Sequence, residues 1–91
     1  MIPDNITKEV ILRAITKIDY EGVPKKREST KYNLLYNNKL YPPKYVISLA
    51  NVYVNGEKLS HKDFSGGDES NGFLTSIGFE IVSKANRNRA V

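Results

Sequence analysis

The fold of this chain depends strongly on one stretch, YPPKYVISLA, at residues 41–50. Its two prolines stop a strand and preset the first turn of a helix, so a helix begins at one of them. Apolar residues then recur at helical spacing, and we expect the helix to end near Asn55 and Gly56. Lys44 stands in the first turn, where the partial positive charge of a helix disfavours a cation. Either this lysine is tolerated there, or it meets an anion.

A first helix is predicted before this stretch, from Ile6 to Glu21. Apolar residues follow the three-and-four spacing of an amphipathic helix there, and Thr7 can cap its first turn. Gly22 and Pro24 end the helix, and a polar loop follows. Between this loop and Tyr41, alternating residues around an Asn-Asn pair predict a short hairpin. We interpret Tyr32 and Tyr36 as core residues of that hairpin.

After the second helix the pattern predicts three short elements. Ser60 and Asp63 resemble a capping box, which favours one helical turn. Residues 68–78 then form a short helix that buries Phe73, Leu74 and Ile77, and residues 79–83 form a last strand. We expect this strand to pair with the hairpin, because two strands alone are marginally stable in water.

These elements predict an α+β fold with a small three-stranded antiparallel sheet and about three helices. Their order is helix, strand, strand, helix, turn, helix, strand, and a winged-helix-like arrangement stays open. Residues 1–84 are expected to form a single module. Residues 85–91 show no apolar period and are interpreted as a disordered tail, or a linker to an effector domain.

Composition excludes several classes of function. The 91 residues suit one small domain, and the lack of cysteine removes disulfides, thiolate metal sites and thiol nucleophiles. No stretch predicts a membrane span or a secretory signal, so we expect a cytoplasmic protein. His61 is the single histidine and is interpreted as an exposed turn residue, not a metal ligand. We therefore expect no catalytic residues, no metal and no cofactor.

Positive charge is concentrated in the middle of the chain. The net charge is +4, and residues 25–44 hold six cations against Glu28 alone. Cations bind phosphates, and tyrosine rings can stack on unpaired bases. Asn71 could contact a base edge from the third helix. The candidate nucleic-acid-binding residues are Lys25, Lys26, Arg27, Lys31, Lys39, Tyr41, Lys44, Tyr45 and Asn71.

Three segments carry a family resemblance: ITKEVILRAITKID (6–19), KLYPPKYVISLA (39–50) and LSHKDFSGGDESNGFLTSIGFEIV (59–82). In this order they resemble the small N-terminal domain of modification-dependent restriction proteins of the McrA and McrB type. The resemblance implies a DNA-recognition module that precedes an HNH nuclease or a GTP-driven motor domain. It also implies that cleavage or GTP hydrolysis belongs to those other segments.

We therefore expect a non-enzymatic DNA-binding module of a prokaryotic restriction system. Its partners would be DNA, in some cases methylated, and the effector nuclease or GTPase motor of the same system, with no membrane. The alternative is a protein-interaction module that docks a partner subunit or a neighbouring catalytic domain. Salt separates the two, because affinity that rests on phosphate contacts falls steeply with salt concentration.

Overall fold

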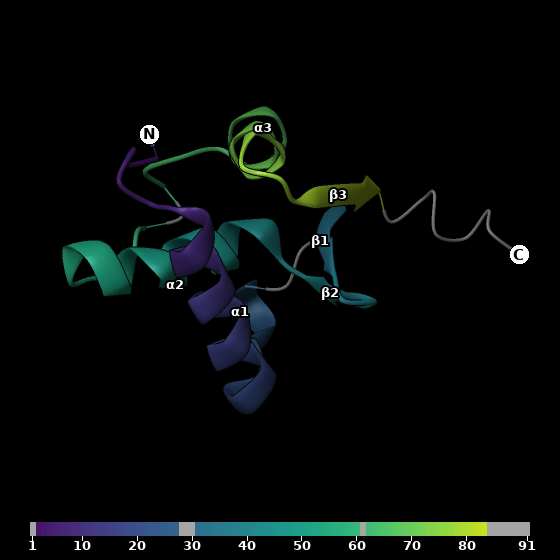
Figure 1. The fold of residues 1–91 in the computed structure, drawn as a ribbon, viewed down its shortest axis with the longest axis horizontal. Helices are drawn as coiled ribbons and strands as arrows, with labels where there is room; N and C mark the ends of the chain where they lie inside the picture. The colour runs from purple at the N-terminus through teal and green to yellow at the C-terminus, as the bar shows by residue number, and fades with distance from the viewer. Residues whose placement is uncertain (1, 28–30, 61, 84–91) are drawn as a thin grey trace, which may run out of the picture.

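The computed structural model describes residues 2–27, 31–60 and 62–83. Figure 1 shows the helices gathered at one end and the sheet at the other. The predicted tail, 85–91, and His61 lie outside the described residues. In chain order the elements are α1 (Lys8–Glu21), the short 3-10 helix η1 (Lys25–Arg27), β1 (Tyr32–Tyr36), β2 (Lys39–Tyr41), α2 (Pro43–Asn55), α3 (Asp68–Ser76) and β3 (Glu80–Ser83). The predicted α+β class and element order are confirmed.

Local signals set the boundaries of the first elements. The Thr7 side chain accepts a hydrogen bond from the backbone N–H of Val10 at 3.4 Å and caps α1. Asn37 and Asn38 both have positive φ values, 55° and 65°, as a two-residue hairpin turn requires. The second helix begins at Pro43, as the prolines predict. Part of the predicted polar loop after α1 is wound into η1.

The sheet has the strand order β2-β1-β3, with both pairs antiparallel. Leu34, in the middle of β1, is aligned with Tyr41 on one side and Ile81 on the other. Leu34 is fully buried and Tyr41 is 3% exposed, so this row belongs to the face that packs on the helices. The expected pairing of the last strand with the hairpin is confirmed.

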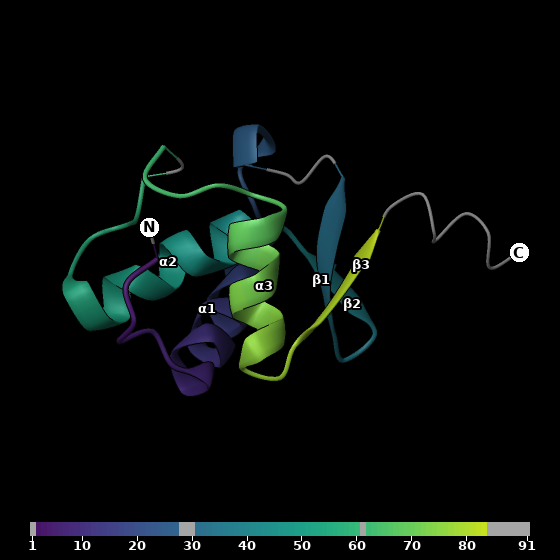
Figure 2. The ribbon, with the colours of Figure 1, turned by 90° about the horizontal axis from the view of Figure 1, so that it is seen from above.

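The third helix ends in a Schellman motif. The N–H of Phe79 donates to the carbonyl of Leu74 at 3.0 Å, and the N–H of Gly78 donates to that of Thr75 at 3.1 Å. Gly78 has a φ of 101°, the left-handed region that favours glycine. This tight ending turns the chain directly from α3 into β3, as seen from above in Figure 2.

Fewer apolar side chains of the α3 segment are fully buried than the sequence predicts. Leu74 is fully buried, whereas Phe73 and Ile77 are only partly buried against the core. The described residues before α3 contain no helix where a helical turn was predicted; the N–H of Asp63 donates to the carbonyl of Ser60 at 2.9 Å, and the Ser60 hydroxyl accepts from the N–H of Lys62.

Candidate nucleic-acid interface

Tyr45 is the centre of a group of cations. Its ring is only 7% exposed and lies in the core at the start of α2. The guanidinium carbon of Arg27 lies 5.3 Å from the centre of this ring, and the ammonium of Lys58 lies 5.6 Å from it. Aromatic faces attract cations, so the ring holds charges from η1 and from the segment after α2 near each other.

Lys44 adds a third cation beside Arg27. Its ammonium lies 4.7 Å from the centre of the Phe64 ring, and its stem lies against Gly66, where an added Cβ would come within 3.3 Å of Lys44 Cδ. Burial lowers the pKa of Lys44, the charge of Arg27 lowers it further, and Glu69 acts in the opposite direction. At the start of α2 the repulsion from Arg27 is therefore partly offset by the carboxylate of Glu69.

Further cations line the junction between α1 and α2. The guanidinium carbon of Arg13 lies 4.4 Å from the centre of the Tyr53 ring. Lys17, one turn further along α1, forms an ion pair with Glu21 at 3.0 Å, which raises the pKa of Lys17. We call Arg13, Lys17, Arg27, Lys44 and Lys58 the cation row.

Two of the rings that the row contacts lie on α2. Tyr45 and Tyr53 are eight residues apart in this helix, which corresponds to about 12 Å along its axis.

The Nη2 atom of Arg27 is buried and has no hydrogen-bond partner among the described residues. One donor in the row is therefore left without an acceptor.

The tyrosines differ from our expectation in how far each is exposed to solvent. Tyr32 and Tyr36 are 39% and 37% exposed, so their interpretation as core residues is wrong. They occupy the two ends of β1, and Leu34 at its centre takes the buried position. Tyr41 is in the core, where its hydroxyl donates a hydrogen bond to Asp19 at 2.7 Å.

The other predicted residues are spread over several elements. Lys25 and Lys26 are exposed on η1 beside Arg27, and Lys31 is exposed just before β1. Lys39 is exposed on β2, with its ammonium 3.9 Å from Asp19. Asn71 is half-buried on α3. The structure thus brings together Arg27, Lys44 and Tyr45, whereas Lys31, Lys39 and Asn71 lie on other elements.

Three members of the row were missed by sequence reasoning: Arg13, Lys17 and Lys58. Arg13 and Lys17 are four residues apart on α1, a spacing that places two cations on one helix face. That signal was available, but the nearness of this face to Tyr45 and Tyr53 depends on how α1 packs on α2. Lys58 lies near Tyr45 because the chain turns back along α2, where the N–H of Leu59 donates to the carbonyl of Ser48 at 3.2 Å.

Comparison with protein families identifies the domain. The model of the ScoMcrA-like N-terminal head domain matches residues 4–83. The chain belongs to this family. The head domain is thus the N-terminal domain of a restriction system, as the resemblance implied. No curated protein and no solved structure shows a significant match to this chain.

The described part of the head domain has two further properties. None of its helices combines the length and the apolar character that crossing a membrane requires. Within the same residues, no three histidine, cysteine or carboxylate side chains gather in a group that could hold a metal ion.

Proposed function

We propose that this head domain binds DNA for a modification-dependent restriction system, and that its cation row holds the phosphate backbone. The observation that carries this proposal is the contact of two cations from different segments, Arg27 and Lys58, with the one ring of Tyr45, at 5.3 Å and 5.6 Å from its centre. Like charges gathered on one surface cost free energy, which a bound anion would offset. A phosphate fits, because it is an anion that accepts hydrogen bonds from both guanidinium and ammonium groups.

The dimensions of the row suit a nucleic-acid backbone. Along one DNA strand a phosphate recurs every 3.4 Å of helix axis, so the about 12 Å between Tyr45 and Tyr53 corresponds to roughly three phosphates. Lys25 and Lys26 are exposed on η1 and add further positive charge beside Arg27. Tyr45 is buried and contacts two of the cations, so its part in this proposal is to position Arg27 and Lys58, not to stack on a base.

The finer parts of the proposal concern specificity and partners. Contacts from Lys31, Lys39 and Asn71 would extend the interface beyond the row, and a modified base such as a methylated one would be the feature that is read. The effector nuclease or GTPase motor would then act at the site where the head domain has bound. Catalysis is assigned to that effector.

The test is a charge reversal within the row, Arg27→Glu with Lys58→Glu. Duplex DNA should bind more than tenfold more weakly at about 0.1 M salt, and the slope of log affinity against log salt should fall by about 2, one for each lost phosphate contact. The comparison variant is Lys31→Glu with Lys39→Glu, which makes the same charge change on exposed residues of the proposed extension and should weaken binding less than the row variant does. If this comparison variant abolishes binding and the row variant does not, the interface is on the hairpin.

A second candidate function is docking of a partner protein on the outer face of the sheet. Leu35, Leu40 and Val82 are half-buried apolar residues, and the register places them on the face opposite Leu34. A domain that docked there would bind with little dependence on salt. Binding to duplex DNA that weakens steeply with salt would favour the first function.

A further inference from the structure

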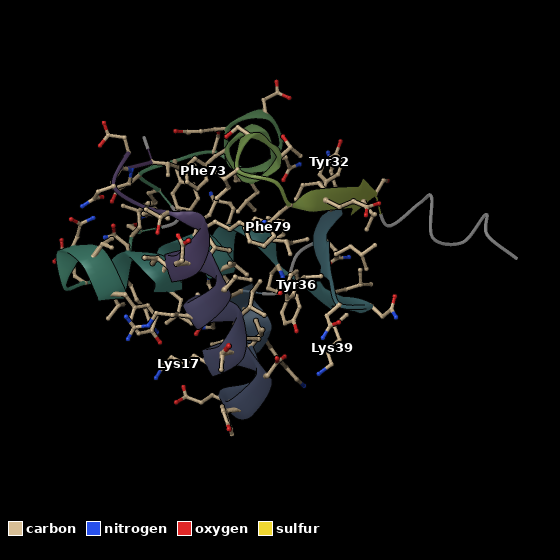
Figure 3. All side chains as sticks on the ribbon, viewed as in Figure 1. Lys17, Tyr32, Tyr36, Lys39, Phe73 and Phe79 are labelled. Atoms are coloured by element: carbon tan, nitrogen blue, oxygen red, sulfur yellow. The ribbon has the colours of Figure 1, made fainter. Side chains whose placement is uncertain are left out.

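An open cleft of about 400 Å³ lies at the tip of the hairpin. The end of β1, the hairpin turn, the first turn of α1 and the start of β3 surround it. Figure 3 shows Tyr36, which lines the cleft, on the other side of α1 from Lys17 of the cation row. No residue of the cation row lines the cleft, and its volume is within the range of sites for small ligands.

An aromatic pair forms one part of the cleft. The ring centres of Tyr36 and Phe79 are 5.9 Å apart, and the ring planes meet at 67°, an edge-to-face contact. Phe79 is 6% exposed, whereas Tyr36 is 37% exposed. The buried ring thus holds the exposed one, and Tyr36 keeps surface that a flat ligand could cover.

Hydrogen-bond donors and hydrogen-bond acceptors both line the rest of the cleft. Asn37 and Asn38 supply amides that both donate and accept hydrogen bonds, and their positive φ values hold them in a tight turn. The ammonium of Lys8 lies 5.8 Å from the centre of the Phe79 ring and can donate, and Glu80 can accept. The opposite charges of Lys8 and Glu80 balance, so the cleft does not select for an anion.

We propose that this cleft binds an unstacked nucleobase. A base is flat, so it can cover the exposed part of the Tyr36 ring, and stacking on an aromatic side chain tolerates any base. Its edge carries donors and acceptors together, which the two asparagine amides and Glu80 can match. The base could come from an unpaired stretch of a nucleic-acid strand or from a free nucleoside. The site goes beyond the proposed function, because it needs no contact with the cation row.

The experiment is a titration of the full chain followed by NMR, with single-stranded DNA decamers of each base, a decamer that lacks bases, and the four free nucleosides at millimolar concentration. At least one base-containing decamer should shift the signals of Tyr36, Asn38 and Gly78, and the decamer without bases should not. Shifts with free nucleosides as well would show that the base alone is sufficient. Shifts with decamers only would show that the base must be part of a strand.

Variants test the ring and the amides separately. Tyr36→Ala should weaken binding of the best decamer at least fivefold, the lower limit for a stacking side chain, and Tyr36→Phe should retain it. Asn37→Gly with Asn38→Gly keeps the turn geometry, because glycine adopts positive φ readily, and removes both amides; it should also weaken binding. Tyr20→Ala is the matched control, because Tyr20 is 88% exposed on α1 and does not line the cleft.

Two results would overturn this proposal. One is that no base-containing decamer or nucleoside shifts the cleft signals. The other is that Tyr36→Ala and the double glycine variant both bind like the parent. Failure of the cation row is a different result, because charge reversal of Arg27 and Lys58 acts on duplex binding and leaves the cleft unchanged.

Discussion

The ammonium of Lys44 lies 4.7 Å from the centre of the Phe64 ring, although twenty residues separate the two in the chain. This contact explains how a cation is accommodated at the positive end of α2. The ring offers a partial negative face that offsets the unfavourable helix dipole. Lys44 is therefore held in place by the folded chain itself, and its charge is opposed by that of Arg27.

Lys44→Ala should lower the free energy of unfolding by less than the about 0.5–1 kcal/mol that such a ring contact usually contributes, because the change also removes the repulsion from Arg27. From the sequence alone we would expect no loss, because the change removes a cation from the positive end of a helix. Thermal unfolding measures the difference. If Lys44 also meets a phosphate, the salt slope of DNA binding should fall by about 1. An unchanged slope together with lower stability would assign Lys44 a structural role only.

Tyr41→Phe should make the domain less sensitive to alkali. Burial of the Tyr41 hydroxyl, assisted by its hydrogen bond to Asp19, raises its pKa from 10.0 to about 12. The unfolded chain loses this proton first, so stability that is present below about pH 10 is lost as pH rises to about 12. The loss is at most about 2–3 kcal/mol. Urea unfolding across this range should show a steeper decline for the parent than for Tyr41→Phe.

Glu69→Gln should destabilise the fold at neutral pH and flatten its response to acid. The Glu69 carboxylate accepts hydrogen bonds from the N–H of Ser65 at 2.9 Å and the N–H of Ile2 at 3.1 Å. Chiefly the Ser65 bond lowers the pKa of Glu69 below its ordinary value. Its contribution is therefore present above that ordinary value and is lost as pH falls through the lowered pKa. Melting temperatures of parent and variant should converge in acid, and a constant difference would contradict this account.

Leu74→Ala should be more damaging than Phe73→Ala. Leu74 is fully buried, and removing a buried leucine typically costs about 2–5 kcal/mol. Phe73 is only partly buried, so its removal should fall below the roughly 3–5 kcal/mol expected for a buried phenylalanine. Urea unfolding of the two variants decides the order. The reverse order would mean that Phe73 contributes more to the core than its exposure indicates.

Sequence reasoning recovered the elements that depend on a few neighbouring residues. Two prolines before α2, the Thr7 cap of α1 and the Asn-Asn hairpin turn each act through local geometry. Such geometry acts within one turn, so a short window of sequence is enough to recognise it. The pairing of β3 with the hairpin also followed, because two strands alone would be marginally stable.

By itself, then, the sequence determined which elements form, in which order, and that positive charge gathers near residues 25–44. Only the tertiary structure decided which tyrosines are buried and which cations become neighbours. The alternating pattern of β1 does not show whether its central or its terminal residues are buried. In the structure Leu34, at the centre, is buried and Tyr36, at one end, is exposed. Arg13 meets Tyr53, and Arg27 and Lys58 meet Tyr45, only because α1, η1 and the segment after α2 all pack beside the same helix. Such contacts join residues distant in the chain, and their cause is the burial of a shared core, which no local pattern encodes.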